Sequence, residues 1–456
     1  MNRRVLISLL VITVVACVIL SFVSMCGAGI LIWEEITSSQ ESILSSEDRP
    51  SIPQGSDGTL SPEIIAHMEL IEKQVADIRQ LEPGGEFTRS FYTPEKLRQR
   101  VLDDFLEDYS PEEARRDSIV LAAFGLLDPQ FDLLDFYTEL LSEQIAGFYD
   151  HEAKEMVVVS GRRFGGAERL TYAHEYTHAL QDFHFDISDG LKYDDEACEG
   201  QSERCAAIQA LLEGDASLSE GEWFAKYATA QDRSEVYAFY QNFQSPIFDQ
   251  APEFISLDFL FPYEQGIGFT QYLWKRGGWE AVNQAYSNPP LSTEQILHPD
   301  QYPLDHPIDV ELPDLSGILD AGWEELDRET VGEWYTYLIL AHGQEETARL
   351  TESQAADAAE GWGGDSYAVF YNATEGTTVM LLATVWDTDD EALQFDDLFR
   401  LYANRRFGEP DQQGDSLTWA SDQGIHLFTR KGDFTLWILA PTRELAVEIK
   451  NAFSFP

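Results

Sequence analysis

The chain has 456 residues, of which 81 are acidic and 30 are basic, giving a formal net charge of -51 at pH 7. The length allows two or three domains, and a hydrophobic content of 44% with 12% aromatic residues is typical of a globular protein. The charge excludes one class of partner. A strongly acidic surface repels phosphate backbones, so we expect no binding to nucleic acid.

The N-terminal segment predicts a membrane anchor. Two arginines precede an uncharged run from Val5 to Trp33, and two glutamates follow it. This run is longer than the roughly 20 residues that span a bilayer, and the flanking charges orient the N-terminus inside and the bulk of the chain outside. Two alternatives, a cleaved signal peptide and a lipoprotein attached at Cys17, fit less well, because signal regions usually have about 7–15 apolar residues and this run continues past Cys17. We therefore predict a single-pass signal anchor in the cell membrane at residues 1–33.

A stalk and a first helix are expected next. Residues 34–60 contain seven serines and few large apolar residues, which is typical of a flexible stalk. Ser61 followed by proline predicts the start of a helix, and the Pro-Gly-Gly at 83–85 predicts its end. Further helical segments are expected up to about Ala146.

Beyond this point a strand is expected before another series of helices. The sequence KEMVVVSG (Lys154–Gly161) is a short β-branched run closed by glycine, which predicts a strand. The following helices are expected to begin near Ala167 and to span residues 202–218, 221–243 and 264–285.

The pattern changes near Gly361, and residues 346–456 predict a small α+β domain whose role the sequence does not indicate. Apolar and β-branched runs predict its strands, and two helical stretches interleave with them. The expected strands are Tyr367–Tyr371, Thr378–Trp386, His426–Thr429 and Thr435–Ala440, and the expected helices are Glu391–Arg406 and Arg443–Phe453.

The stretch RLTYAHEYTHALQDFHFDI (Arg169–Ile187) contains the pattern of a metal-binding helix. His174 and His178 are four residues apart, which on a helix places both imidazoles on one face, about 5–6 Å apart at Cβ, as two ligands of one zinc ion require. Glu175 lies beside them, where a carboxylate can take a proton from water at the metal. A chance match on an amphipathic helix is the alternative, but the strand before the helix and its apolar side favour a genuine HExxH site.

Two residues compete to be the third zinc ligand. His184 makes HEYTHALQDFH nearly match the HExxHxxGxxH pattern of metzincins, but Gln181 stands where that pattern requires glycine, and no methionine follows before the C-terminal domain. Glu213 lies 35 residues after His178, in AIQALLEGDASL, and a helix packed against the first would complete a His2Glu site. We therefore predict that His174, His178 and Glu213 bind Zn2+.

The order of these motifs resembles that of the gluzincin metallopeptidases. LEGDA (Leu212–Ala216) is similar to the Asn-Glu-Gly-Phe-Ala segment of the aminopeptidase N-like gluzincins, and FPYEQG (Phe261–Gly266) resembles their Pro-Tyr-Glu-Lys-Gly segment. The resemblance covers roughly Gly147 to Tyr286. It implies that the glutamate of LEGDA binds zinc, that Glu175 is the catalytic base and that Tyr263 hydrogen-bonds the oxyanion.

Two departures limit what this resemblance implies. The chain lacks the Gly-x-Met-Glu-Asn segment with which those aminopeptidases bind the free amine of the substrate, and Leu212 and Asp215 replace the Asn and Phe of their third-ligand segment. Aminopeptidase activity is therefore not implied. A closer overall resemblance is to membrane-anchored bacterial proteins of uncharacterised function with a peptidase MA-like HEYTHALQD helix.

Four more residues are candidates for supporting roles. Asp215 is expected either to orient a ligand histidine through its free ring nitrogen or to be a solvated acid. His298 is expected either to help bind the transition state or to be a structural histidine before proline. Cys198 and Cys205 can pair in an oxidising compartment only if they do not share one helix, because seven helical residues rise about 10.5 Å and a disulfide needs Cα atoms within roughly 7 Å.

Together these patterns predict an α+β protein with a mostly helical, zincin-like catalytic domain and a small edge-strand sheet at residues 61–345, followed by the domain at 346–456. The predicted function is hydrolysis of a peptide or protein substrate by a membrane-anchored, extracytoplasmic, zinc-dependent peptidase. The strand Met156–Ser160 is expected to be the edge against which an extended substrate pairs. The alternative is a catalytically inactive zincin-fold surface protein that binds a partner.

Overall fold

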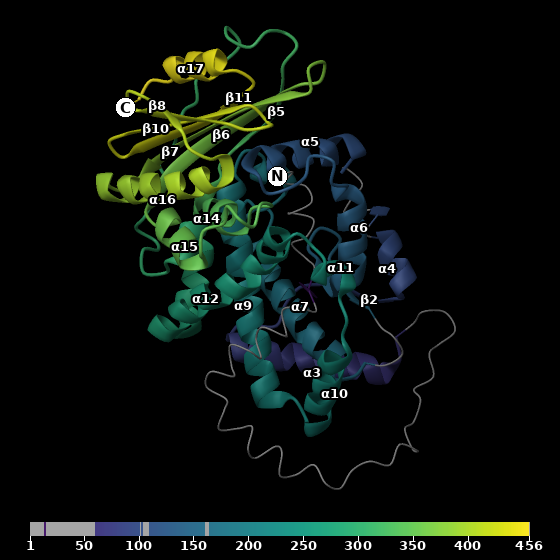
Figure 1. The fold of residues 1–456 in the computed structure, drawn as a ribbon. Coiled ribbons are helices and arrows are strands. Elements are labelled where there is room, and N and C mark those ends of the chain that lie inside the picture. Colours follow the sequence, from purple (N-terminus) through teal and green to yellow (C-terminus); the bar gives the residue numbers. More distant parts are fainter. Residues whose placement is uncertain (1–12, 15–59, 101, 104–108, 160–163, 456) are drawn as a thin grey trace.

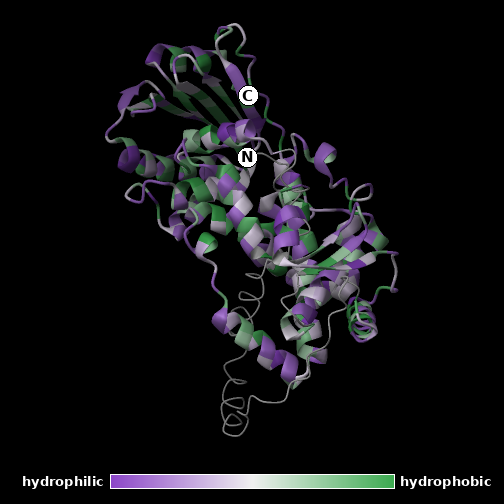
Figure 2. Ribbon diagram, turned by 90° about the vertical axis from the view of Figure 1, so that its right-hand side faces the viewer, coloured by the Kyte–Doolittle hydropathy of each residue, from purple (hydrophilic) through white to green (hydrophobic). Residues whose placement is uncertain are grey.

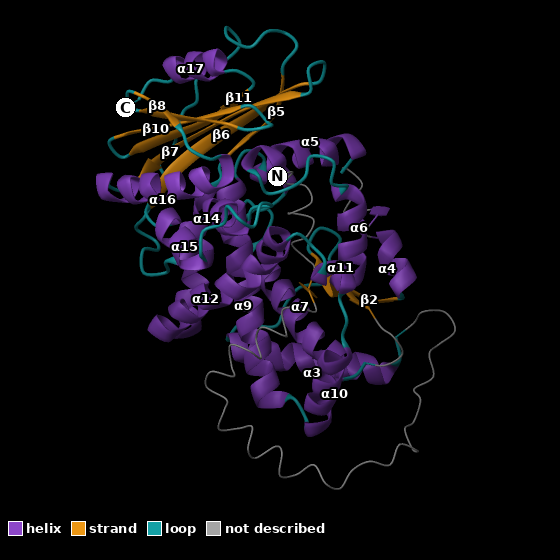
Figure 3. Ribbon diagram, viewed as in Figure 1, coloured by secondary structure: helices purple, strands orange, loops and turns teal. Residues whose placement is uncertain are grey.

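The chain folds into a helical region with one small sheet, followed by a C-terminal α+β region built on a large sheet (Figure 1, Figure 3). The computed structural model describes residues 13–14, 60–100, 102–103, 109–159 and 164–455. The α+β class predicted from the sequence is confirmed.

Helices dominate the first region, and their ends follow local sequence signals. The first helix begins where the Ser61 hydroxyl accepts a hydrogen bond from the backbone N–H of Ile64 at 3.3 Å, and Gln80 ends it in the left-handed conformation. The helices of this region are α3 (Pro62–Arg79), α4 (Pro94–Arg100), α5 (Pro111–Phe124), α6 (Leu133–Gln144), α7 (Gly166–Phe185), α8 (Asp195–Cys198), α9 (Ser202–Tyr227), α10 (Ala230–Asn242), α11 (Pro246–Asp249), α12 (Glu253–Ser287) and α13 (Thr293–Leu297).

The helix α9 is longer than the sequence predicts. The expected break between residues 218 and 221 does not occur, and the chain stays helical to Tyr227. Ser219 and Glu220 are buried at this point, so tertiary packing against α7 and α12 outweighs the weak helix propensity of the segment. The helix α12 also begins before the predicted residue 264 and contains Pro262.

The small sheet of the helical region has the strand order β1-β3-β4-β2. Its strands are β1 (Thr13–Val14), β2 (Thr88–Tyr92), β3 (Ile145–Asp150) and β4 (Glu155–Val159). The strand β4 pairs in parallel with β2 on one side and antiparallel with β3 on the other. The prediction that Met156–Ser160 forms an exposed edge is therefore wrong, because both sides of β4 are already hydrogen-bonded. The strand that flanks β4 and packs on α7 is β3.

The predicted anchor and stalk lie almost entirely outside the described residues. Of residues 1–33 only Thr13 and Val14 are described, as the two-residue strand β1 that pairs with β3 at Ile145 and Gly147. Among the described helices, none combines the length and the apolar character that crossing a bilayer requires. The membrane anchor therefore stays a prediction.

The C-terminal region is built on a seven-stranded antiparallel sheet with the order β5-β6-β7-β11-β10-β9-β8. The four predicted strands and two predicted helices are confirmed as β6, β7, β10, β11, α16 and α17. The elements of this region are β5 (Glu324–Glu329), α14 (Gly332–His342), α15 (Glu352–Ala359), β6 (Trp362–Asn372), β7 (Thr377–Trp386), α16 (Asp389–Phe407), β8 (Asp411–Gln413), β9 (Ser416–Ala420), β10 (Ile425–Lys431), β11 (Phe434–Ala440) and α17 (Arg443–Ala452).

Each face of the large sheet packs against a different partner. One face holds Val379 and Leu381 in a cluster with α17, whereas Met380 and Leu382 face the opposite side and join the main core. That main core is continuous from the helical region to α16, where Phe395 stacks on Trp386 with ring centroids 4.5 Å apart. Figure 2 shows hydrophobic residues along the strands and hydrophilic residues spread over the surrounding helices. The sheet is therefore anchored to the helical region through a shared core.

A disulfide joins the end of α8 to the start of α9. Cys198 and Cys205 have Cα atoms 6.0 Å apart, within the range that a disulfide spans. The chain leaves the helical path between them at Gly200, whose φ of 68° lies in the left-handed region. The structure thus meets the sequence condition that the two cysteines do not share one helix.

Candidate metal centre

The HExxH motif lies on α7, which is buried between the small sheet and α9. The helix begins after Gly165, whose backbone N–H donates to the Glu168 carboxylate at 3.0 Å. Near its other end, Asp182 accepts a hydrogen bond from the Tyr149 hydroxyl of β3 at 2.7 Å and pairs with Lys154 at 2.5 Å. These contacts fix the position of α7 relative to β3.

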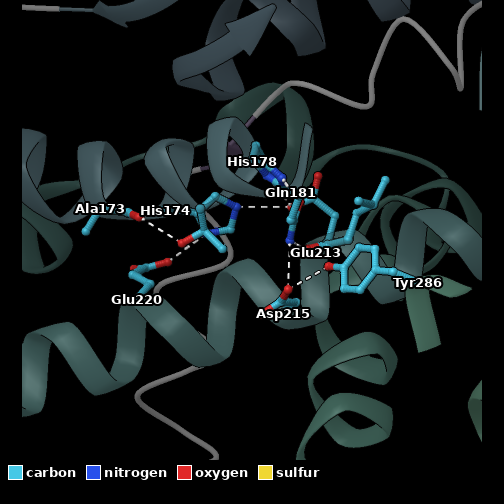
Figure 4. Close-up of polar contacts among 10 residues, drawn as sticks. Ala173, His174, His178, Gln181, Glu213, Asp215, Glu220 and Tyr286 are labelled. Atoms are coloured by element: carbon cyan, nitrogen blue, oxygen red, sulfur yellow. Dashed lines mark hydrogen bonds and ion pairs between the residues drawn. The ribbon is translucent and has the colours of Figure 1, made fainter. Parts of the chain in front are cut away.

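Two histidines of α7 and one glutamate of α9 meet at a single point. The Glu213 Oε2 atom lies 3.1 Å from His174 Nε2 and 3.4 Å from His178 Nε2 (Figure 4). Tetrahedral ligands at roughly 2.0–2.1 Å from zinc are about 3.3–3.4 Å apart, so these separations fit one shared ion. Candidate ligand atoms of the three residues all lie within 4.8 Å of one another, and this is the one such group among the described residues. His174, His178 and Glu213, which we call the metal group, can therefore hold a metal ion.

Partners on the far side of each imidazole orient the ring toward that point. His174 Nδ1 lies 3.0 Å from Glu220 Oε2, and His178 Nδ1 lies 2.8 Å from Gln181 Oε1. An Nδ1–H that donates to these oxygens leaves the Nε2 lone pair for a metal. In each histidine, Nδ1 is thus assigned to its hydrogen-bond partner and Nε2 to the metal ion.

Gln181 is held in turn by a buried network (Figure 4). Its Nε2 donates to the Leu212 carbonyl at 2.9 Å and to Asp215 Oδ2 at 3.2 Å. Asp215 also accepts from the Tyr286 hydroxyl at 2.6 Å and pairs at 2.7 Å with Arg79, and both members of that ion pair are fully buried. Asp215 therefore does not contact a ligand histidine directly, as one sequence alternative expected, but acts through Gln181.

The charges of this group favour an ionised carboxylate. Burial raises the pKa of Glu213, but the charge of His178 and hydrogen bonds from both histidines lower it more, so the pKa falls below its usual value. Burial lowers the pKa of His174, but its hydrogen bonds to Glu213 and Glu220 have the opposite and larger effect. The net result is a pKa of about 10. Protons and metal therefore compete for the histidine nitrogens, and metal binding releases protons.

Glu175 is placed beside the group but does not belong to it. Its side chain is fully buried, and neither carboxylate oxygen has a well-aligned hydrogen bond with a described group, although the backbone N–H of Tyr149 in β3 approaches it. Burial raises the pKa of Glu175 to about 7, against the opposing charges of the two histidines. A buried carboxylate with unsatisfied oxygens next to a metal group has the position and the proton affinity of a general base.

A close approach of two helices places Glu213. A Cβ atom added to Gly214 of α9 would overlap the backbone carbonyl of Gly266 in α12, and one added to Gly266 would overlap the carbonyl of Ala210. The two glycines belong to the LEGDA and FPYEQG segments, so these segments are in contact. Gly214 therefore has a packing function that the sequence alone did not reveal.

We expect Gly214→Ala to lower stability by about 1–3 kcal/mol, because the added methyl must force α9 and α12 apart. Gly221→Ala is the matched control in the same helix, since nothing lies within 4 Å of a Cβ added there. That control should gain up to about 1 kcal/mol from the higher helix propensity of alanine. Thermal unfolding of the two variants checks this, and equal stabilisation of both would show that the helices do not touch at Gly214.

The other predicted residues separate into two groups. Tyr263 of α12 is buried beside the metal group, with its ring centroid 6.5 Å from that of His174. His184 lies outside the group, and its Nε2 is hydrogen-bonded with the backbone carbonyl of Glu82 at 2.8 Å. His298 is likewise engaged elsewhere, with Nε2 2.8 Å from Glu333 Oε1 in α14.

Sequence reasoning missed the two residues that orient the histidines. Glu220 follows Glu213 by seven residues, which is two helical turns, so both carboxylates lie on one face of α9. Gln181 follows His178 by three residues and shares its face of α7. The spacing of Glu220 was a usable signal, but only for a helix predicted to continue through residue 220.

Comparison with known proteins identifies only part of the C-terminal region. Residues 321–450 match a family described as a domain of unknown function, DUF8575. This match begins before β5 and ends within α17, so it covers all seven strands of the large sheet and none of the three candidate metal ligands. No curated protein and no solved structure matches the chain.

Proposed function

We propose that this protein is a membrane-anchored, extracytoplasmic, zinc-dependent peptidase of the gluzincin type. The observation that carries the proposal is the convergence of buried His174, His178 and Glu213 with the unsatisfied carboxylate of Glu175 next to them. Two histidines and one carboxylate are the ligand set of many catalytic zinc sites, which keep one position open.

In the proposed hydrolysis, each residue at or near the metal group has a separate role. Zinc held by the three ligands would supply a Lewis acid that polarises the scissile carbonyl and lowers the pKa of water at the site to about 7. Glu175 accepts the proton that the attacking water loses and delivers it to the leaving amine. Tyr263 donates a hydrogen bond to the oxyanion from its position beside His174.

The outer side of β3 is the proposed binding edge for the substrate backbone. This strand packs on α7, and the described segment Thr13–Val14 pairs with it in antiparallel orientation. An extended peptide can make the same backbone hydrogen bonds, with its scissile bond near Glu175. Membrane insertion of residues 1–33 requires Thr13 and Val14 to leave this edge, which frees it for substrate.

The proposed location outside the cytoplasm has one structural support. The disulfide between Cys198 and Cys205 is of the kind that persists in oxidising compartments and is rare in the cytosol. The uncharged run at residues 5–33 supplies the anchor.

The direct test is metal content and hydrolysis measured on the full chain in detergent. We expect one zinc ion per chain, cleavage of an unfolded protein substrate, loss of cleavage on chelation, and recovery when zinc is returned. Bound zinc without any hydrolysis would instead support the inactive, partner-binding alternative. Absence of bound zinc would contradict the peptidase and would leave only the inactive, partner-binding alternative.

A further inference from the structure

A cavity lies where the helical region meets the large sheet. Its walls come from α5, α9, α12, α13, α14, β5 and β6, several of which meet at this junction in Figure 1. Its volume is ≈ 80 Å³. At roughly 10–15 Å³ for each water, the cavity can hold about five to eight waters. It can equally hold one side chain that has about the same number of non-hydrogen atoms.

The cavity lies next to the metal group on two helices. Gln209 lines it and precedes Glu213 by four residues on α9, so the two side chains share a face and are separated by about 6 Å along the axis. Pro262 also lines it and directly precedes Tyr263 on α12. A substrate held at the metal group therefore has this cavity within reach of a neighbouring side chain.

The cavity is lined by acids and by no basic residue. Glu203, Asp258 and Glu329 contribute to its lining, whereas no Lys, Arg or His does so among the described residues. The partners of the first two are uncharged. Glu203 accepts from the backbone N–H of Thr293 at 2.8 Å, and Asp258 accepts from Trp334 Nε1 at 3.1 Å.

Buried carboxylates with only neutral donors are costly, and a cation in the cavity would lower that cost. Burial raises the pKa of Asp258 to about 6 and that of Glu203 to about 8, in spite of the hydrogen bonds that each carboxylate accepts. Aromatic rings complete the lining. Phe261 and Trp334 lie with ring centroids 4.8 Å apart, and such rings attract a cation placed over their faces.

We propose that this cavity receives the side chain of an arginine or lysine residue that flanks the scissile bond of the substrate. The inference rests on the proposed peptidase function and adds a substrate class to it. Apolar and aromatic walls fit the methylene stem, and Asp258 and Glu203 pair with the terminal cation. The formal net charge of -51 draws basic peptides toward the protein.

Binding tests the proposal independently of hydrolysis. The probes are two blocked peptides that are identical except for arginine or citrulline at one position, since citrulline has the shape of arginine without its charge. Calorimetric titration into zinc-loaded Glu175→Gln should show tighter binding of the arginine peptide, on the order of tenfold to a hundredfold. Equal affinity for the two peptides, or no binding of the arginine peptide, would overturn the proposal.

A variant assigns the preference to the cavity. Asp258→Asn removes one charge while its side-chain oxygen still accepts from Trp334, and the Tyr335 hydroxyl can turn to accept from the new amide. In that background the affinity ratio of the arginine and citrulline peptides should fall toward one. Asp397→Asn, at an exposed position of α16, is the control for loss of charge and should keep the ratio. A ratio unchanged by Asp258→Asn would place the preference elsewhere and contradict the proposal.

Cleavage by the wild-type chain separates this inference from the proposed function. Arginine and citrulline peptides that are cleaved at equal rates would leave the peptidase intact and reject the cavity as a pocket for basic side chains. Preferential binding of the arginine peptide without cleavage would support the cavity and reject the peptidase.

Discussion

Replacing Glu213 by alanine is expected to remove most of the zinc affinity of the protein. The carboxylate lies 3.1 Å from His174 Nε2 and 3.4 Å from His178 Nε2, so it is already positioned to bind the metal. Its pKa is below the usual value, so it is ionised. Zinc sites with four protein ligands bind with about 10–16 kcal/mol, or about 2.5–4 kcal/mol for each ligand, which predicts a loss of roughly 70- to 900-fold. Competition of each variant with a zinc-chelating dye measures the effect.

Two further variants provide reference values for the loss of zinc affinity in Glu213→Ala. Glu220→Ala removes the partner of His174 Nδ1 and should weaken zinc binding by roughly 10–100-fold. His184→Ala should leave the affinity unchanged, because that histidine bonds to the backbone of Glu82 outside the metal group. Tighter zinc binding by Glu213→Ala than by His184→Ala would restore the metzincin alternative and overturn the assignment of the third ligand.

The metal ligands were predictable because short-range patterns define them. The spacing of His174 and His178 fixes their shared face as soon as the segment is helical, and the LEGDA segment marked Glu213. The orienting residues were not predictable in the same way. Glu220 has its role only because α9 continues through residues 219–221, and that continuity comes from burial between α7 and α12 rather than from local propensity.

Strand order was the other feature that local patterns left undetermined. The run of Met156, Val157 and Val158 is buried on both faces, which is typical of a central strand. Its antiparallel partner β3 is joined to it by the short turn at 151–154, but its parallel partner β2 comes from a segment distant in sequence. The strand β5 reads EELDRE and has no apolar alternation. It is held at the end of the sheet by pairing with β6, and it lies before the domain boundary predicted at residue 346.

Glu175→Gln is expected to abolish nearly all peptide hydrolysis while leaving the metal group intact. Glu175 is fully buried beside the ligands but is not one of them, so the amide should keep the zinc affinity of the wild type. Glutamine has nearly the same shape and carries no buried charge, so the fold should tolerate it. It cannot accept the proton of the attacking water, and the loss of a general base lowers the rate by about 10²–10⁴-fold.

Zinc content, thermal unfolding and peptide cleavage measured on the same preparation separate these effects. Glu222→Gln, at an exposed position on α9, is the matched control for loss of one carboxylate charge and should retain wild-type cleavage. A low rate accompanied by low zinc content would make Glu175 a metal ligand rather than the base. Wild-type turnover by a zinc-loaded Glu175→Gln variant would show that another group accepts the proton. The assignment of Glu175 as the general base would then be wrong.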